Sequence, residues 1–416
     1  MGIRVARPDD VVAVGALTAE AYLADGLLSD DDDYAAELRD AQRRADEAVL
    51  LVATTATPDG RQAVVGTITV APYGSSYAEV AEPGEVELRM LAVAPEARHQ
   101  GVAAQIMRAA QREALRLGAR RLVLSTQDAM AAAQRLYARL GFVREPERDW
   151  GHEVVHLRVF TWTPPEAPGM LVEAATWPPV RTVVTPDGWW VGVSGGFTRR
   201  ANSAMPLGHP ADLAAAVDRV EAVYTDAGLA PILRMGSGAP EGLANELAAR
   251  GYAERARTDV MVRAVDGDAA AALVPPAAAP AWSGHVRVAD EPDDVWLRAF
   301  LGVKQDGAHA DLARAVLSAA PAHYLTATVG GEVVGTLRVA YAEQWAGLSC
   351  LAVSPQTRRR GLGSALMRDG IALAGRQGAH RAFLQVEAAN TVAAGLYAQL
   401  GLVLADGYAY LVGGER

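Results

Sequence analysis

An internal repeat organises this sequence. The segment LAVAPEARHQGVAAQIMR, which begins at Leu91, returns as LAVSPQTRRRGLGSALMR at Leu351, 260 residues later. The match continues without a gap to Val143 and Val403, and 22 of the 53 aligned positions are identical. A repeat of this length indicates that one structural unit is built twice. A chain of 416 residues, half of them hydrophobic, has room for about three modules that each bury a core.

Each copy shows the same alternation of strands and helices. The apolar runs LRMLAV and LSCLAV predict strands that end at Pro95 and Pro355, because proline lacks the N–H that a strand ladder needs. Residues 102–117 and 362–377 have helical spacing and are followed by glycines that stop helices. Further strands (RRLVLS and RAFLQV) and helices near residues 129–140 and 391–400 complete the pattern.

The loop between the first strand and the helix has the features of an anion site. The N-terminus of a helix exposes unpaired N–H groups and carries about half a positive charge. Small residues let an anion approach the backbone, and they recur here as Gly101, Ala103 and Ala104, and as Gly361, Gly363 and Ser364. Arg98 and Arg358 add positive charge. The pattern predicts a cradle for a diphosphate, although it is neither a Walker loop nor G-x-G-x-x-G.

The order R-x-x-G-x-[GA], helix, strand and L-Y-x-x-L-G, found twice in register, resembles the GNAT acetyltransferase superfamily. The resemblance covers about Ile3–Thr163 and about His285–Val412. It implies tandem GNAT folds of the α/β class, α+β in character with a mixed sheet. It also implies acetyl-CoA as the acyl donor, no metal, and an amine acceptor that attacks the thioester directly in a ternary complex. A small-molecule amine and a protein amine both remain candidates for the acceptor.

The same resemblance assigns the residues that bind coenzyme A. In the first copy they are Leu91, Ala92, Val93, Arg98, His99, Gln100, Gly101, Val102, Ala103 and Ala104. In the second copy they are Leu351, Ala352, Val353, Arg358, Arg359, Arg360, Gly361, Leu362, Gly363 and Ser364. Asn390 matches a family asparagine that contacts the cofactor, whereas the first copy has Met130 there.

Catalytic residues also follow from the resemblance. Tyr137 and Tyr397 match the family tyrosine near the sulfur, which would protonate the leaving thiolate; the alternative is a packing tyrosine on an amphipathic helix. Glu87 lies six residues before Val93, where several GNAT enzymes carry a general base; the alternative is an exposed strand carboxylate. The equivalent position in the second copy is Gly347, so its base must come from elsewhere: Glu343, Glu387 or a water chain.

Pro-, Ala- and Gly-rich stretches at residues 163–169 and 266–284 predict linkers. They divide the chain into an N-terminal GNAT domain (1–163), a degenerate GNAT-like middle module (170–265) and a C-terminal GNAT domain (284–416). In the middle module MPLGHP replaces the phosphate loop and Leu247 replaces the tyrosine, so no coenzyme A site is expected there. The segment GGFTRRANSAMP (residues 195–206), together with the GNAT module that follows, resembles a two-part actinobacterial acetyltransferase family, with Met170–Arg416 as one unit. In this interpretation Arg199 and Arg200 touch an anion or the nucleotide end of the cofactor; the alternative is a solvated hairpin.

Composition excludes several other classes. The net charge of −10 argues against a nucleic-acid partner, and no run of about twenty apolar residues predicts a membrane span. A single cysteine, Cys350, and an N-terminus without the apolar core of a signal peptide predict a cytoplasmic protein.

HEVVH (residues 152–156) matches the zincin pattern, but its β-branched context predicts one straight strand, so no metal is expected. The rival functions are an acetyl-CoA sensor or scaffold and an aminoacyl-tRNA-dependent transferase.

Overall fold

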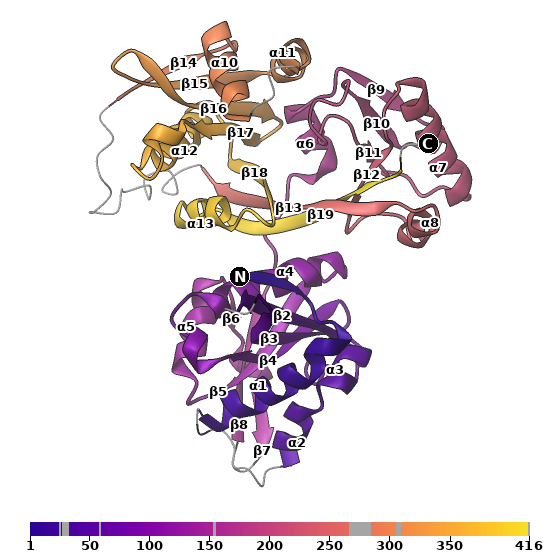
Figure 1. Ribbon diagram of the computed structural model, residues 1–416, viewed down its shortest axis with the longest axis vertical. Coiled ribbons are helices and arrows are strands. Elements are labelled where there is room, and N and C mark those ends of the chain that lie inside the picture. Colours follow the sequence, from indigo (N-terminus) through magenta and orange to yellow (C-terminus); the bar gives the residue numbers. More distant parts are fainter. Residues whose placement is uncertain are drawn as a thin grey trace. The chain divides into compact units, whose positions relative to one another are not determined.

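The protein forms two compact units, Met1–Pro164 (unit 1) and Pro165–Arg416 (unit 2). The computed structural model describes residues 1–24, 26, 33–57, 60–152, 155–265, 284–304 and 309–414 (Figure 1). Most of the predicted second linker lies outside the described residues. No helix in these ranges is long and apolar enough to cross a membrane.

Unit 1 is a mixed sheet covered by helices. Its strands are β1 (Gly2–Val5), β2 (Val49–Ala56), β3 (Gln62–Pro72), β4 (Glu85–Val93), β5 (Arg121–Gln127), β6 (Val143–Arg144), β7 (Trp150–His152) and β8 (Val155–Trp162). Its helices are α1 (Val11–Ala24), α2 (Asp33–Arg39), α3 (Ala41–Glu47), α4 (Val102–Arg116) and α5 (Ala131–Arg139), with short 3-10 turns η1 (Pro8–Asp10), η2 (Pro95–Ala97) and η3 (Pro146–Arg148). The strand order is β1-β2-β3-β4-β5-β8-β6, and β4 and β5 are parallel.

Unit 2 is built on one larger sheet. Its strands are β9 (Arg181–Val184), β10 (Trp190–Val193), β11 (Ala204–Met205), β12 (Ile232–Gly236), β13 (Ala253–Ala264), β14 (His285–Ala289), β15 (Ala322–Val329), β16 (Glu332–Ala342), β17 (Trp345–Val353), β18 (Arg381–Glu387) and β19 (Val403–Val412). Its helices are α6 (Gly169–Thr176), α7 (Leu213–Asp226), α8 (Leu243–Ala249), α10 (Asp294–Lys304), α11 (Ala310–Ser318), α12 (Leu362–Arg376) and α13 (Thr391–Gln399), with the 3-10 turn η5 (Pro355–Thr357). The strand order is β14-β15-β16-β17-β18-β13-β19-β12-β11-β10-β9.

The two halves of unit 2 exchange their closing strands. In unit 1, β8 closes the sheet by pairing with both β5 and β6. In unit 2, the strand that pairs with β18 is β13 from the middle segment, and the strand that pairs with β12 is β19 from the C-terminal segment. Figure 1 shows β13 and β19 running side by side, antiparallel from Ala253↔Val412 to Val262↔Val403. Residues 170–265 and 284–416 therefore share one continuous sheet.

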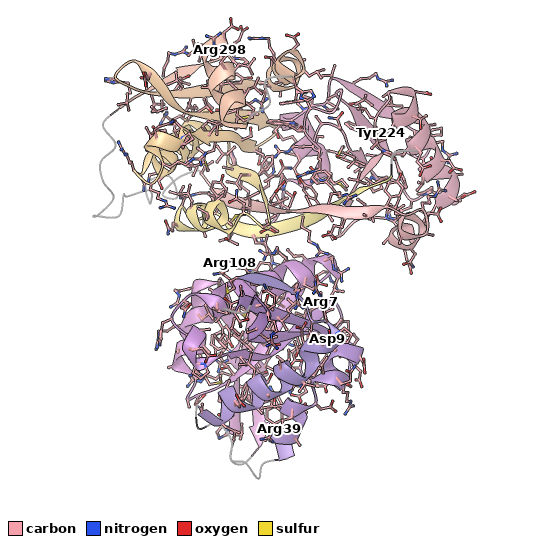
Figure 2. The ribbon with its side chains drawn as sticks, in the orientation of Figure 1. Arg7, Asp9, Arg39, Arg108, Tyr224 and Arg298 are labelled. Carbon is pink, nitrogen blue, oxygen red and sulfur yellow. The ribbon has the colours of Figure 1, made fainter. Side chains whose placement is uncertain are left out.

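The predicted helices pack as their spacing requires. α4 buries Ile106, Met107, Ala110 and Ala114, which recur every three or four residues and so lie on one face. α12 buries its equivalent positions in the same way. In the middle segment the core includes Tyr224 (Figure 2), whose hydroxyl donates a hydrogen bond to the carbonyl of Gly192. Each copy of the repeat thus packs its helix with the same register of apolar side chains.

The HEVVH segment is not one straight strand, so that prediction is wrong. β7 and β8 pair antiparallel, with Gly151 opposite His156, and the chain reverses between them. Gly151 permits the close pairing of the two strands, since its φ is +151° and a Cβ there would lie 2.0 Å from the Val155 carbonyl oxygen. The expected spacing of about 13 Å between the two histidines, which assumed four residues of straight strand, therefore does not apply.

Candidate active sites

A bulge occurs at the same place in β4 and β17. Met90 and Cys350 have positive φ angles of 54° and 57°, which non-glycine residues rarely adopt. On the partner strands only one residue lies opposite two: the register passes from Thr69↔Arg89 to Thr67↔Ala92, and from Arg338↔Ser349 to Thr336↔Ala352. The bulge re-aims the strand immediately before the predicted cofactor-binding residues.

The parallel strands separate at the same level in both units. The ladder between β4 and β5 ends at the pair Leu88↔Leu124. The ladder between β17 and β18 ends at the equivalent pair Leu348↔Leu384. Beyond these pairs, residues 91–93 and 351–353 pair only with β3 and β16. Their other edge carries backbone groups that a ligand can bind as an added strand would. This is where the sequence places the pantetheine contacts.

The loops after these strands have the same conformation and leave the helices uncapped. His99 and Arg359 have φ angles of 61° and 60°, and Gly101 and Gly361 have φ angles of 78° and 80°. Gly101 and Gly361 are the N-cap residues of α4 and α12, and neither helix has a side-chain cap hydrogen bond. The first N–H groups of both helices, at residues 102–104 and 362–364, therefore suit an anion, as the sequence predicts.

The first arginine of each loop forms a hydrogen bond to the end of the preceding strand. The Nε of Arg98 donates to the Val93 carbonyl at 3.3 Å, and the Nε of Arg358 donates to the Val353 carbonyl at 3.2 Å. These bonds tie each loop to the end of its strand. The remaining loop residues Gln100, Arg359 and Arg360 are exposed.

Asn390 has a structural role in addition to the expected one. It is the N-cap of α13, and its side-chain oxygen accepts a hydrogen bond from the Ala393 N–H at 3.1 Å. Met130 holds the same place in unit 1 without a cap bond. The difference between the copies at this position is therefore a difference in helix capping.

In the middle segment the corresponding helix, α7, has an N-terminus that is capped by a side chain. The N-cap of α7 is Asp212, whose carboxylate accepts a hydrogen bond from the Ala215 N–H. The loop before it is also filled, since a Cβ on Gly208 would lie 2.1 Å from the Asp187 carbonyl oxygen. A carboxylate already occupies the place that a phosphate takes at such a terminus, which supports the expectation that this segment holds no coenzyme A.

Glu87 is buried and not an exposed strand carboxylate. Its side chain is 1% exposed, and its Oε2 accepts a hydrogen bond from the Val80 N–H at 2.8 Å. Burial raises the pKa of Glu87, although this hydrogen bond and the guanidinium of Arg89 act in the opposite direction. Val80 belongs to the long connection between β3 and β4, which also contacts Arg89 through the Tyr77 carbonyl and Glu79. A buried carboxylate with a raised pKa therefore lies on the bulged strand of unit 1, where the sequence predicts a base.

The equivalent position in unit 2 is covered by a helix from the middle segment. β16 and β17 are joined by a tight turn, without the long connection of unit 1. Helix α6 covers the face of β17 on which a side chain of residue 347 would lie, because a Cβ on Gly347 would be 2.9 Å from Thr176 Oγ1 and 3.0 Å from Phe383 Cζ. One turn earlier on α6, the buried Glu173 accepts hydrogen bonds from Arg234 and Gln385, and its Oε1 has no partner. No sequence feature near Gly347 indicates that it is covered by α6, which lies about 170 residues earlier in the chain.

Neither predicted substitute base lies beside Gly347. Glu343 is exposed at the turn between β16 and β17. Glu387 forms an ion pair with Arg199, and Arg200 stacks over Trp177 with its guanidinium carbon 4.7 Å from the ring centroid. Arg199 thus joins the two halves of unit 2, whereas Arg200 covers an indole ring of its own segment.

The two motif tyrosines are protonated at neutral pH. Tyr137 is buried beside Phe142 and Phe160, and burial raises its pKa to about 12. Burial also raises the pKa of Tyr397, which is less deeply buried. Tyr137 lies near Tyr22 on α1, whose pKa is raised by burial and by the hydroxyls of Tyr34 and Tyr137. Packing and proton donation are compatible at both positions.

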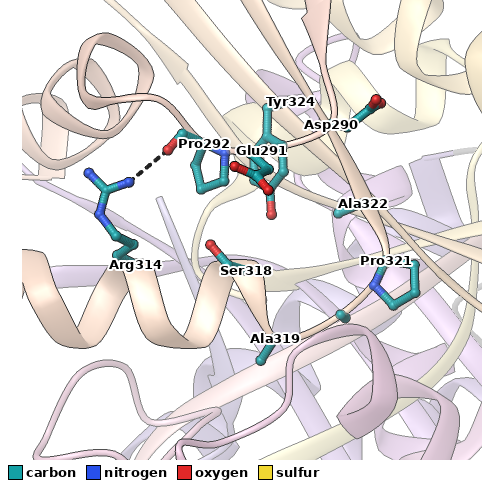
Figure 3. A pocket seen from close by; sticks show the side chains of 10 residues that line it. Asp290, Glu291, Pro292, Arg314, Ser318, Ala319, Pro321, Ala322 and Tyr324 are labelled. Carbon is teal, nitrogen blue, oxygen red and sulfur yellow. Dashed lines mark hydrogen bonds between the residues drawn. The ribbon is translucent and has the colours of Figure 1, made fainter.

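A pocket of about 510 Å³ lies at the opposite end of the unit 2 sheet (Figure 3). It is lined by residues that include Glu291, Arg314, Ser318 and Tyr324. Ala322, at its edge, pairs with Ala340, whereas Val353 at the phosphate loop pairs with Gly335. Four residues of β16, at positions 336–339, therefore lie between the level of this pocket and the level of the loop.

Each of the two sheets has a bulged central strand, and each bulged strand is followed by a helix without a side-chain N-cap. This arrangement defines a protein with tandem GNAT folds. The chain belongs to the GNAT acetyltransferases. Residues 171–411, more than half of the chain, match the family described as "Probable histone acetyltransferase Rv0428c C-terminal", and residues 17–142 match the Acetyltransferase (GNAT) family. No curated protein matches the chain.

Solved structures of similar proteins include a GCN5-related N-acetyltransferase from Kribbella flavida, with 18% identity, a TM-score of 0.43, and coverage of 59% of this chain and 95% of that one. A tandem GNAT protein from the clavulanic acid biosynthesis pathway has 14% identity, a TM-score of 0.35, and coverage of 100% and 99%. A GCN5-related N-acetyltransferase from Sphaerobacter thermophilus has 16% identity, a TM-score of 0.30, and coverage of 99% and 94%.

Proposed function

We propose that this protein is an N-acetyltransferase with two donor sites, one in unit 1 and one in the C-terminal half of unit 2. Acetyl-CoA supplies the acetyl thioester, and an amine acceptor attacks it directly. The observation that carries the proposal is the pair of uncapped helix termini, each reached through a bulged strand and a loop of matching backbone angles. The same features coincide twice in one chain, whereas the third such helix terminus is closed by Asp212.

The donor would be held by backbone groups. The open edges of residues 91–93 and 351–353 suit the amides of pantetheine, and the helix termini at residues 101–104 and 361–364 suit the diphosphate. A backbone N–H on the bulged strand is placed to polarise the thioester carbonyl.

In unit 1 the proton movements are assigned to two side chains. An amine with a pKa of about 10.4 is almost fully protonated at neutral pH, so a base is needed before it can attack. Glu87, with its raised pKa, takes that proton. Tyr137, which stays protonated, gives a proton to the leaving thiolate. In unit 2, Tyr397 gives the proton to the leaving thiolate. β17 supplies no general base, because Gly347 stands where unit 1 has Glu87.

The acceptor class is kept open for unit 1. The description of the matching family names a probable histone acetyltransferase, so protein lysines belong in the acceptor panel beside small amines. A sensor or scaffold that binds acetyl-CoA without turnover is the rival.

The decisive experiment blocks each helix terminus separately. Ala104→Glu and Ser364→Glu place a carboxylate in the first turn of α4 and α12, where it favours the helix but repels a phosphate. Ala104→Gln and Ser364→Gln are the neutral controls. We expect calorimetry to count two acetyl-CoA sites, with one lost in each Glu variant and both kept in the Gln variants. Binding without release of coenzyme A across an amine panel would establish the sensor, and no binding would overturn the proposal.

A further inference from the structure

The clearest unsatisfied polar groups of unit 2 lie together on the face that α6 covers. Arg338 on β16 is fully buried, and its Nη2 has no hydrogen-bond partner. Ser349 on β17 lies directly opposite Arg338 in the sheet, and its buried Oγ also has no partner. Directly opposite residues of neighbouring strands point to the same face. Two adjacent buried groups without partners call for an explanation, because such groups are rare in folded proteins.

The surroundings of Arg338 supply two carbonyl groups and the rings of Trp177 and Tyr324, but no carboxylate among the described residues. Its Nε donates to the Leu317 carbonyl at 3.0 Å, and its Nη1 donates to the Thr176 carbonyl at 2.8 Å. These carbonyls lie at the C-terminal ends of α11 and α6, which carry partial negative charge. Among the described residues, no carboxylate lies within ion-pair distance of Arg338. A buried guanidinium without a counter-charge is costly, so an anionic ligand is strongly favoured there.

In unit 1 the equivalent pair of opposed residues includes an arginine whose charge is balanced by carboxylates. There the residue equivalent to Arg338 is Thr69, and the residue equivalent to Ser349 is Arg89. Arg89 is paired with Glu79 at 2.9 Å and lies 3.9 Å from Glu87. Unit 2 keeps an arginine in this pair but has a glycine, Gly347, in place of the strand carboxylate. The missing negative charge is the difference that a ligand can supply.

We propose that Arg338 and Ser349 bind the carboxylate of the acceptor, so that the C-terminal site acetylates an amine that carries a carboxylate a few bonds away, such as a free amino acid. This inference rests on the proposed acetyltransferase function. Arg338 Nη2 and Ser349 Oγ are both donors, and a carboxylate offers two acceptor oxygens. Ser349 lies two residues before Leu351, directly before the bulge at Cys350, which leaves a short reach between the carboxylate and the proposed site of attack.

A group of the opposite kind lies on the same helix. Glu173, one turn before Thr176 on α6, has a buried Oε1 without a partner, and this oxygen matches the ammonium of an amino acid. The unsatisfied atoms of this face therefore include donors and an acceptor, as a zwitterion requires. Entry of the ligand requires Thr176 to move, because it lies on Gly347 and its carbonyl binds Arg338.

The test uses the full chain with Ala104→Glu, so that turnover reports unit 2. Amino acids are compared with their amides, their decarboxylated amines and their aminophosphonate analogues. We expect kcat/KM for the amino acids to exceed that for amides and amines by roughly 100-fold. Ser349→Ala, which removes no side-chain hydrogen bond among the described residues, should cut this preference about tenfold through KM and leave the amines unchanged. Thr326→Val, which removes another buried hydroxyl without a partner, is the matched control.

Arg338→Met should abolish the preference, and its folding is checked by the acetyl-CoA affinity of unit 2. Equal rates for amino acids, amides and amines, or an unchanged preference in Ser349→Ala, would overturn the inference. A preference for aminophosphonates would assign the site to phosphate instead of carboxylate. If acetyl-CoA binds and no acceptor reacts, the proposed function of unit 2 fails. Calorimetry with N-acetyl amino acids then decides: binding that weakens in Ser349→Ala supports the carboxylate site, and absence of binding refutes it.

Discussion

The bulged strands β4 and β17 have the same backbone but opposite side-chain chemistry. In unit 1 the strand carries Glu87 and Arg89 beneath the long connection from β3. In unit 2 the same places hold Gly347 and Ser349 beneath α6, and the arginine has moved to the neighbouring strand as Arg338. The parts that the proposed function assigns to the donor are the same in both repeats, while the parts that it assigns to the acceptor differ. This difference supports our proposal that the two sites use one donor and different acceptors.

The strongest way to break this comparison is Glu87→Gln. We expect turnover at unit 1 to fall by roughly 100- to 1000-fold, because the general base is lost, while turnover at unit 2 stays the same. In the unsubstituted protein, kcat/KM at unit 1 should fall as the pH drops through a pKa above the ordinary glutamate value, since protonated Glu87 cannot accept a proton. Rates measured in the Ser364→Glu and Ala104→Glu backgrounds separate the units.

The same variant has a readout in stability. Burial raises the pKa of Glu87, so its ionised form costs free energy above that pKa, and this cost is absent at lower pH. Glu87→Gln should therefore be as stable as the parent, or more stable, at neutral pH. A loss of both activity and stability would mean that Glu87 is structural.

The two motif tyrosines should behave alike. Tyr137→Phe and Tyr397→Phe should each lower turnover at their own unit by roughly 10- to 100-fold, because the leaving thiolate loses its proton donor. Burial raises the pKa of both, to about 12 for Tyr137, so neither rate should show a tyrosine ionisation below about pH 10. Unchanged rates in both variants would leave only the packing role beside Phe142 and Phe160.

The smallest effects concern the packing of α6. Gly347→Ala should destabilise unit 2 by about 1–3 kcal/mol, because its Cβ would meet Thr176 and Phe383 at 2.9–3.1 Å. Gly395→Ala, in α13 with no atom within 4 Å of the new Cβ, should stabilise unit 2 by up to about 1 kcal/mol. Denaturant midpoints of the two variants should lie on opposite sides of the parent. A neutral Gly347→Ala would show that α6 does not hold its place on β17.

The repeat predicted what depends on local sequence. The helices over residues 102–116 and 362–376, the strands before them and the open glycine termini follow from periodicity and from the backbone freedom of Gly101 and Gly361. What it missed depends on contacts between distant segments. Nothing near Gly347 indicates that Thr176 lies on it, and nothing near Ser349 indicates that Arg338 is its neighbour. The antiparallel pairing of β7 and β8 was missed because β-branched residues favour two paired strands as much as one long strand.

The exchange of β13 and β19 makes the halves of unit 2 incomplete without each other. If the chain were cut between residues 265 and 284, each fragment would carry the closing strand of the other and expose a long unpaired edge of its own sheet. Such fragments should recover the sheet only as a pair, by mutual complementation, and a lone fragment would find its missing strand in a second copy of itself or in an aggregate. The middle segment, whose α7 terminus is closed by Asp212, is thereby an obligatory folding partner of the half that has the open terminus of α12.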